Sequence, residues 1–161
     1  MAVGVVGLRT VPWFATELFT QGAARLASLF LGVEAIRADT GWALPFTAQP
    51  VLVTVACAAT DFYLMAAALL SWHFMRSAGR VKWLPTVAVA ALLAAVPVTL
   101  FVNALRIVAV AHAHHWVISR LPASYDAFLH LLTGASVFLP ALIALNLILE
   151  LYGRSSSALR D

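Results

Sequence analysis

Three residues of the types used in acyl transfer occur at separate points of the sequence. They are Cys57, the only cysteine in the chain, Arg106 within an apolar run, and His130 near the start of another apolar run. A cysteine sulfur can attack a peptide carbonyl, an imidazole can carry protons, and a guanidinium can stabilise the developing oxyanion. Taken singly, each has an ordinary explanation, such as a buried thiol or an arginine that reaches lipid phosphates. A catalytic role therefore depends on elements that bring the three side chains together.

The composition places these residues in a membrane protein. The 161 residues are 63% hydrophobic and only 11% charged, whereas a soluble domain carries about 25% charged residues. Apolar runs near residues 51–72, 83–102 and 128–149 are each about as long as the 20 residues that cross the hydrocarbon of a bilayer. We predict a single all-α integral membrane domain over residues 1–161. The net charge of +3 is small, and it indicates loops that orient the chain rather than a nucleic-acid-binding surface.

Cys57 lies where a short extended segment is predicted to give way to a helix. Turn residues in 34–50 and β-branched residues in 51–55 predict an extended or hairpin-like segment, and the Ala/Leu-rich run at about 58–75 predicts a helix. The thiol would then lie at a helix N-terminus, where the helix dipole favours the thiolate. Asp61, one turn further on, would oppose this effect unless it pairs with an arginine, Arg106 being the candidate. Helix capping is the other explanation for Asp61.

The basic loops predict the orientation of the chain. Residues 76–82 form the densest basic loop, which the positive-inside rule assigns to the cytoplasm. Cys57, one membrane thickness away, is therefore expected on the outer side. The next helix, at about residues 83–103 with a kink at Pro97, returns the chain to that side.

The second half of the chain is predicted to hold a short outer helix and one more span. Residues 107–116 are apolar but rise less than about 20 Å as a helix, too little to cross a bilayer, so an outer interfacial helix is predicted there. A cap signal at Ser124 or Asp126 predicts the start of a last helix that reaches about residue 151. Residues 152–161 would then form a basic cytoplasmic tail.

The N-terminal region, residues 1–40, is predicted to hold a helix at about residues 12–33. Glu17, Gln21 and Arg25 recur every four residues and so share one face. Such a face fits a tilted span with its polar stripe toward the protein interior, which we favour, or an amphipathic helix in the interface. With the span, the chain has about four transmembrane helices and both termini in the cytoplasm. The three candidate catalytic residues then lie near one outer surface.

Three further residues are candidates for a supporting role. Asn103 shares a helical face with Arg106 and would position that arginine or a substrate carbonyl, or cap the helix end. Asp126, four residues before His130, would orient the imidazole or cap its own helix. Gly134 would allow another helix to approach closely or make room for a substrate helix.

Three short motifs occur in order along the chain: ACAATDF at residues 56–62, NALRI at 103–107 and HLLTG at 130–134. In this order they resemble the exosortase/archaeosortase family of membrane cysteine transpeptidases, and they look most similar to the short K-type exosortases. The resemblance covers residues 41–151 as a catalytic core. Many exosortases carry a Ser-Gly pair after the cysteine, where this chain has two alanines at 58–59.

The resemblance implies an enzyme of the bacterial inner membrane whose active site faces the outer, periplasmic side. Its substrates would be exported proteins whose C-terminal sorting signal holds a short Pro-Glu-Pro-like motif, a transmembrane helix and a basic tail. Cys57 would be the nucleophile, His130 the acid and base, and Arg106 the oxyanion stabiliser, with no cofactor or metal. The acyl group would pass to a lipid amine, a polysaccharide component or water.

Two other functions fit parts of the sequence. His112, His114 and His115 at a membrane surface could bind haem or a metal ion in a small electron-transfer or metal-handling subunit. Against this, His114 and His115 are consecutive and point about 100° apart on a helix. No cysteine or carboxylate lies near them in the sequence. The other alternative is a membrane assembly protein without catalytic activity.

Overall fold

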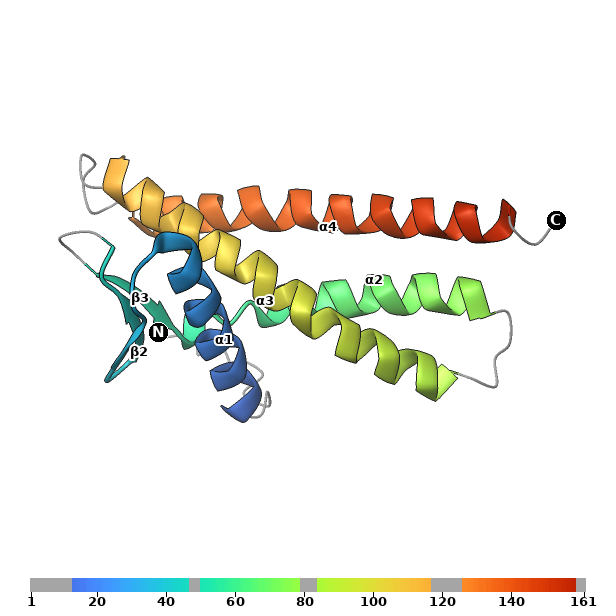
Figure 1. The fold of residues 1–161 in the computed structure, drawn as a ribbon, viewed down its shortest axis with the longest axis horizontal. Coiled ribbons are helices and arrows are strands. Elements are labelled where there is room, and N and C mark those ends of the chain that lie inside the picture. The colour runs from blue at the N-terminus through green and yellow to red at the C-terminus, as the bar shows by residue number, and fades with distance from the viewer. Residues whose placement is uncertain (1–12, 47–49, 79–83, 117–125, 159–161) are drawn as a thin grey trace, which may run out of the picture.

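The computed structural model describes residues 13–46, 50–78, 84–116 and 126–158 of the chain. In these parts the chain is mostly helical, as predicted, and it carries one small sheet (Figure 1). The elements in chain order are α1 (Trp13–Leu31), β1 (Ile36–Ala38), β2 (Gly41–Leu44), β3 (Val51–Thr54), the 3-10 turn η1 (Val55–Cys57), α2 (Thr60–Ala78), α3 (Leu84–Trp116) and α4 (Asp126–Ala158).

The extended segment predicted before Cys57 is a three-stranded antiparallel sheet in the order β1-β2-β3. Residues 39–40 form the turn between β1 and β2, and Trp42 pairs with Val53 across β2 and β3. Gly41 has a φ of 151°, and a Cβ at this position would collide with the carbonyl oxygen of Val53. Glycine is therefore needed for the close pairing of β2 with β3. The last strand leads directly into η1, which carries the cysteine.

Helix α1 lies across α3 with small residues at the contact (Figure 1). Ala23, Ala24 and Ala27 are fully buried. A Cβ at Gly22 would lie 2.7 Å from Leu100 Cδ2 of α3. Small side chains let helix backbones approach closely, so this face of α1 sets the distance between the two helices.

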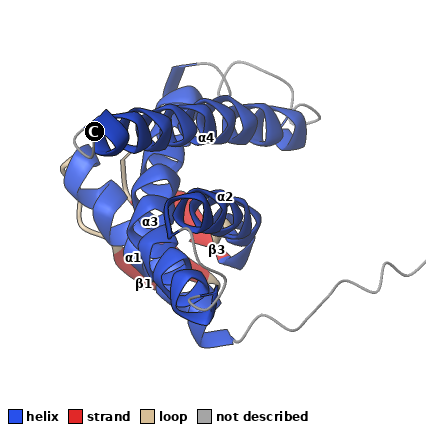
Figure 2. Cartoon of the chain, turned by 90° about the vertical axis from the view of Figure 1, so that its right-hand side faces the viewer, coloured by secondary structure: helices blue, strands red, loops and turns tan. Residues whose placement is uncertain are grey.

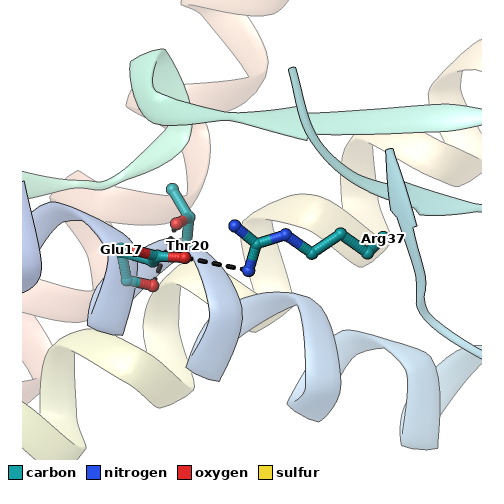
Figure 3. A network of polar contacts seen from close by, with 3 residues as sticks. All are labelled: Glu17, Thr20 and Arg37. Carbon is teal, nitrogen blue, oxygen red and sulfur yellow. Dashed lines mark hydrogen bonds and ion pairs between the residues drawn. The ribbon is translucent and has the colours of Figure 1, made fainter. Parts of the chain in front are cut away.

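Charged side chains connect the sheet to α1. Arg37 Nη1 of β1 lies 2.9 Å from Glu17 Oε1 of α1 (Figure 3), and Thr20 Oγ1 donates to the Glu17 carbonyl oxygen at 3.0 Å. The guanidinium carbons of Arg37 and Arg25 lie 5.6 Å and 5.9 Å from the centre of the Trp42 ring. Two members of the predicted polar face, Glu17 and Arg25, therefore face the sheet.

Helix α3 is continuous from Leu84 to Trp116, so the prediction of a separate interfacial helix at residues 107–116 is wrong. That prediction followed from the length that a bilayer allows. The chain itself has no glycine or proline between residues 103 and 116 that would end a helix. Pro97 lies inside the helix. With a rise of about 1.5 Å per residue, α3 is about 50 Å long.

Two segments of the described helices, Leu84–Ala113 and Leu131–Gly153, are long and apolar enough to cross a membrane. They support membrane association through α3 and α4, whereas spans by α1 and α2 stay predictions. Helix α4 continues to Ala158, so the tail predicted at residues 152–161 is helical over most of its length. Large apolar side chains are exposed along α4, as suits contact with lipid, among them Leu131, Leu139, Ile143 and Leu147.

Helices α2, α3 and α4 pack against one another and form the second part of the core (Figure 2). Phe62 and Ala66 of α2 are buried in this cluster. Further along, His73 Nε2 of α2 lies 3.0 Å from Asn146 Oδ1 of α4. The two helices therefore stay in contact over several turns, and the sheet lies at the end of the bundle where α2 begins (Figure 1).

Candidate active site

Cys57 is the last residue of η1, and only 7% of its surface is exposed. The turn is closed by a 3.0 Å hydrogen bond from the Ala58 N–H to the Val55 carbonyl oxygen. Helix α2 begins at Thr60. Cys57 thus lies just ahead of α2, close to the predicted position at a helix N-terminus, although α2 begins at Thr60 and not at about residue 58.

The side chains around Cys57 come from α1, the sheet and α3. Its apolar cluster contains buried alanines of α1, Leu44 and Val53 of the sheet, and Ala104 and Ile107 of α3. Cys57 is therefore buried within an apolar cluster of small and branched residues.

Ala59 adopts a left-handed backbone conformation with a φ of 52°. This region is unfavourable for an alanine and easily reached by glycine. The backbone at position 59 therefore favours glycine, although the chain has alanine there.

Asn103 connects α3 to the backbone of Cys57. Its Nδ2 donates a 2.6 Å hydrogen bond to the Cys57 carbonyl oxygen, and its side chain is 1% exposed. Its Oδ1 has no hydrogen-bond partner among the residues that the structure describes. Because α3 continues to Trp116, Asn103 does not cap a helix end. The contact with Cys57 was not among the roles predicted for it.

Arg106 lies inside the protein, with 8% of its surface exposed. It shares a face of α3 with Thr99 and Asn103, because steps of three and four residues return to the same side of a helix. Its guanidinium carbon lies 5.3 Å from the centre of the Phe138 ring of α4. Because Arg106 is buried, it does not extend to lipid phosphates, and that explanation of Arg106 is wrong.

Gly134 leaves room for Arg106 beside α4. A Cβ at this position would lie 3.1 Å from Arg106 Nε, closer than an ordinary van der Waals contact. Phe138, one turn further along α4, stacks on Phe62 of α2 with ring centres 4.9 Å apart. Arg106, Phe138 and Phe62 therefore form a column that joins three helices. Sequence reasoning missed both rings, because nothing in their local spacing links positions on different helices.

His130 and Asp126 belong to the first two turns of α4, and their side chains lie outside the described residues. Position 130 precedes Gly134 by four residues, and Gly134 precedes Phe138 by four, so the three positions share one face of α4. Arg106 meets this face at Gly134 and Phe138. Position 130 of the α4 backbone therefore lies on the face that contacts Arg106.

Asp61 does not form the predicted pair with Arg106. It lies exposed in the first turn of α2, whereas Arg106 is buried. Glu17 and Arg37 form an ion pair elsewhere in the described parts of the chain. A carboxylate in a first helical turn interacts favourably with the helix dipole, so Asp61 fits a helix-stabilising role.

The histidines near the end of α3 were the basis of the haem or metal hypothesis. His112 Nδ1 lies 2.9 Å from the Val108 carbonyl oxygen, and its ring packs on Phe46 with centres 5.0 Å apart. The side chains of His114 and His115 lie outside the described residues. In the remainder, no group of three or more His, Cys, Asp or Glu side chains is arranged to hold a metal ion.

The geometry thus joins the cysteine motif to the arginine motif through Asn103, and the arginine motif to α4 through Gly134. Comparison of the chain with protein-family models, curated proteins and solved structures finds no match. The function of the chain therefore has to be argued from its own residues.

Proposed function

We propose that the chain is a membrane cysteine peptidase or transpeptidase of the exosortase type. The observation that carries this proposal is the hydrogen bond from Asn103 Nδ2 to the Cys57 carbonyl oxygen. It links the candidate nucleophile to α3, whose Arg106 contacts α4 four residues beyond His130. Buried polar and charged groups are costly in apolar surroundings. A thiol that served only to fill the core would not require an asparagine and an arginine on the helix beside it.

In the proposed reaction the Cys57 sulfur attacks the carbonyl carbon of the scissile peptide bond, and His130 takes the thiol proton. Arg106 stabilises the negative charge on the carbonyl oxygen of the tetrahedral intermediate. The carbon–nitrogen bond then breaks, His130 protonates the leaving amine, and a thioester remains on Cys57. Attack by an amine or by water releases the acyl group and restores the thiol.

The proposed substrates are exported proteins whose C-terminal sorting signal contains a Pro-Glu-Pro-like motif, a transmembrane helix and a basic tail. Enzyme and substrate would share the bacterial inner membrane, with Cys57 toward the outer side and with about four enzyme helices spanning the bilayer. The acceptor would be a lipid amine, a polysaccharide component or water. The exposed apolar side chains of α4 support this arrangement, because a substrate helix can approach along a lipid-facing surface.

Replacement of the thiol tests the proposal directly. Cys57→Ala should abolish the shortening of a co-expressed substrate that carries such a signal, because the chain has no second cysteine. The amount of enzyme in the membrane fraction, measured by immunoblot, should stay at the wild-type level. Normal processing by the Cys57→Ala protein would refute the proposal.

A matched control separates the position of the thiol from its presence. The double variant Cys57→Ala, Ala58→Cys keeps one thiol and moves it by a single residue within the same turn. It should also be inactive, because the displaced sulfur no longer occupies the place that the contact with Asn103 fixes. Activity comparable to wild type would mean that the geometry around Cys57 is not the source of catalysis.

A further inference from the structure

The side-chain amide of Asn103 is fully buried, and only its donor half is used. Nδ2 donates to the Cys57 carbonyl oxygen at 2.6 Å, while Oδ1 has no hydrogen-bond partner in the described parts of the chain. The orientation of the amide follows from chemistry. A carbonyl oxygen can only accept, so the nitrogen must face it, and the reversed amide would bring two acceptors into contact.

The donor half has a structural purpose that the local backbone explains. The Tyr63 N–H bonds to the Ala59 carbonyl oxygen, so the hydrogen-bond ladder of α2 starts beyond Cys57. The Cys57 carbonyl oxygen would lack a partner in its buried surroundings without the asparagine, and such a group is costly. Asn103 therefore fixes the peptide unit of the candidate nucleophile from a separate helix.

The acceptor atom of the amide, Asn103 Oδ1, stabilises no other group in the described parts of the chain by a hydrogen bond. An unpaired buried acceptor is unfavourable. The Cys57 thiol, which is buried nearby, does not donate to it. An acceptor kept open beside the candidate nucleophile suits a donor that arrives with a ligand.

The geometry points to Asn103 as a positioning and substrate-binding residue, whose Nδ2 fixes the Cys57 peptide unit and whose Oδ1 accepts a hydrogen bond from a backbone N–H of the peptide being cleaved. The contact of Oδ1 with a peptide rests on the proposed function. The positioning of Cys57 by Nδ2 rests on the observed hydrogen bond alone.

The inference also limits the form of the bound peptide. In the interior of a helix the backbone N–H groups are already bonded to carbonyl oxygens of the preceding turn, and only the first four N–H groups of a helix are free. The segment that reaches Asn103 must therefore be extended at that point or belong to the first turn of a helix. The interior of a transmembrane helix would have to unwind before its peptide bonds could make this contact.

The test compares two buried polar residues on the same face of α3. Asn103→Leu removes both halves of the amide and keeps the branched shape and the number of side-chain heavy atoms, and Asn103→Ala is the second variant in case the larger leucine disturbs the packing. Thr99→Val is the matched control. Thr99 is fully buried one turn away, and its Oγ1 also lacks a partner among the described residues, so it forms no hydrogen bond with Cys57.

The first measurement is the rate at which N-ethylmaleimide alkylates Cys57 in the full chain, reconstituted in lipid nanodiscs without substrate. Both Asn103 variants should change this rate several-fold, because the sulfur is no longer held in place. Thr99→Val should leave it unchanged. A rate in both Asn103 variants equal to that of Thr99→Val would overturn the positioning role.

The second measurement is processing of the sorting-signal substrate. Asn103→Leu should lower kcat/KM by about tenfold or more through a higher KM as well as a lower kcat, as expected when a binding hydrogen bond is lost. Wild-type KM in both Asn103 variants would overturn the peptide contact. If the wild-type chain processes no substrate, the proposed function fails, and the proposed peptide contact fails with it. The alkylation rate then tests, on its own, whether Asn103 positions Cys57.

Discussion

The two alanines after Cys57 have opposite backbone conformations. Ala58 is right-handed, with φ −68° and ψ −11°, whereas Ala59 is left-handed, with φ 52°. The reversal lets the chain pass from η1 into α2 while Cys57 stays in contact with Asn103. One strained residue therefore lies two positions from the candidate nucleophile.

Glycine substitutions at these two alanines should have opposite effects. Ala59→Gly should raise the free energy of unfolding by about 0.5 kcal/mol, because relief of about 1–2 kcal/mol of left-handed strain outweighs the extra entropy that glycine loses. Ala58→Gly should lower it by about 0.5–1 kcal/mol, because no strain is relieved there. Thermal unfolding of the full chain in detergent, followed by circular dichroism, measures both. Equal changes in the free energy of unfolding for Ala58→Gly and Ala59→Gly would contradict the left-handed conformation of Ala59.

The sequence allows the local environment of Cys57 to be predicted better than its contacts. The β-branched run before Cys57 and the alanines after it predict a change from strand to helix, and such a change is present. The bond from Asn103 joins positions 46 residues apart, and propensity says nothing about such pairs. The pairing of Asp61 with Arg106 failed for the same reason, since a shared side of the membrane does not specify which side chains meet.

At the scale of elements, the approach of α3 to α4 depends on the absence of a side chain at Gly134. Gly134→Ala would place a Cβ 3.1 Å from Arg106 Nε and force the guanidinium to shift by a few tenths of an ångström. We expect processing to fall by about tenfold, because small displacements of catalytic groups slow reactions strongly. Stability should change little. The readouts are kcat for the sorting-signal substrate and the unfolding temperature.

Gly153 is the matched control on the same helix. A Cβ at Gly153 meets nothing within 4 Å, and the residue lies in α4 far from Arg106. Gly153→Ala should stabilise α4 by up to about 1 kcal/mol, as for alanine in place of glycine within a helix, and leave processing unchanged. A loss of activity at Gly153 as large as at Gly134 would show that the effect comes from helix flexibility instead of contact with Arg106.

The elements themselves were predictable where the chain carries its own signals. Turn residues around Gly41 predicted the hairpin, and the apolar runs predicted α2, α3 and α4. The break predicted within α3 came from bilayer thickness, and the residues between 103 and 116 contain no helix breaker to produce it. Where a membrane rule and the local sequence disagreed, the local sequence was the better guide to the backbone.

At the scale of the whole molecule, the predicted orientation in the membrane can be tested at the two ends of the bundle. Helix α3 ends near the sheet, and α4 ends at the opposite side (Figure 1). Trp116 at the end of α3 is 63% exposed and Tyr152 of α4 is 72% exposed. In a Cys57→Ala background, which removes the only native thiol, Trp116→Cys should react with a membrane-impermeant maleimide added to intact spheroplasts.

Tyr152→Cys in the same background should react only after lysis, because the basic loops assign that end to the cytoplasm. The proportion of labelled protein, read on a gel, distinguishes the two positions. Labelling of Tyr152→Cys and not of Trp116→Cys in intact cells would reverse the orientation. Labelling of both from outside would contradict a bundle that spans the bilayer.

The length of α3 links the site to the lipid around it. The apolar segment Leu84–Ala113 holds 30 residues, which is about 45 Å of helix, against about 30 Å of hydrocarbon. Hydrophobic mismatch of this kind is relieved by tilt, and α3 is inclined to α2 and α4 (Figure 1). Because Asn103 and Arg106 belong to this helix while Cys57 does not, we expect the acyl-chain length of the surrounding phospholipids to affect the position of these two residues relative to Cys57.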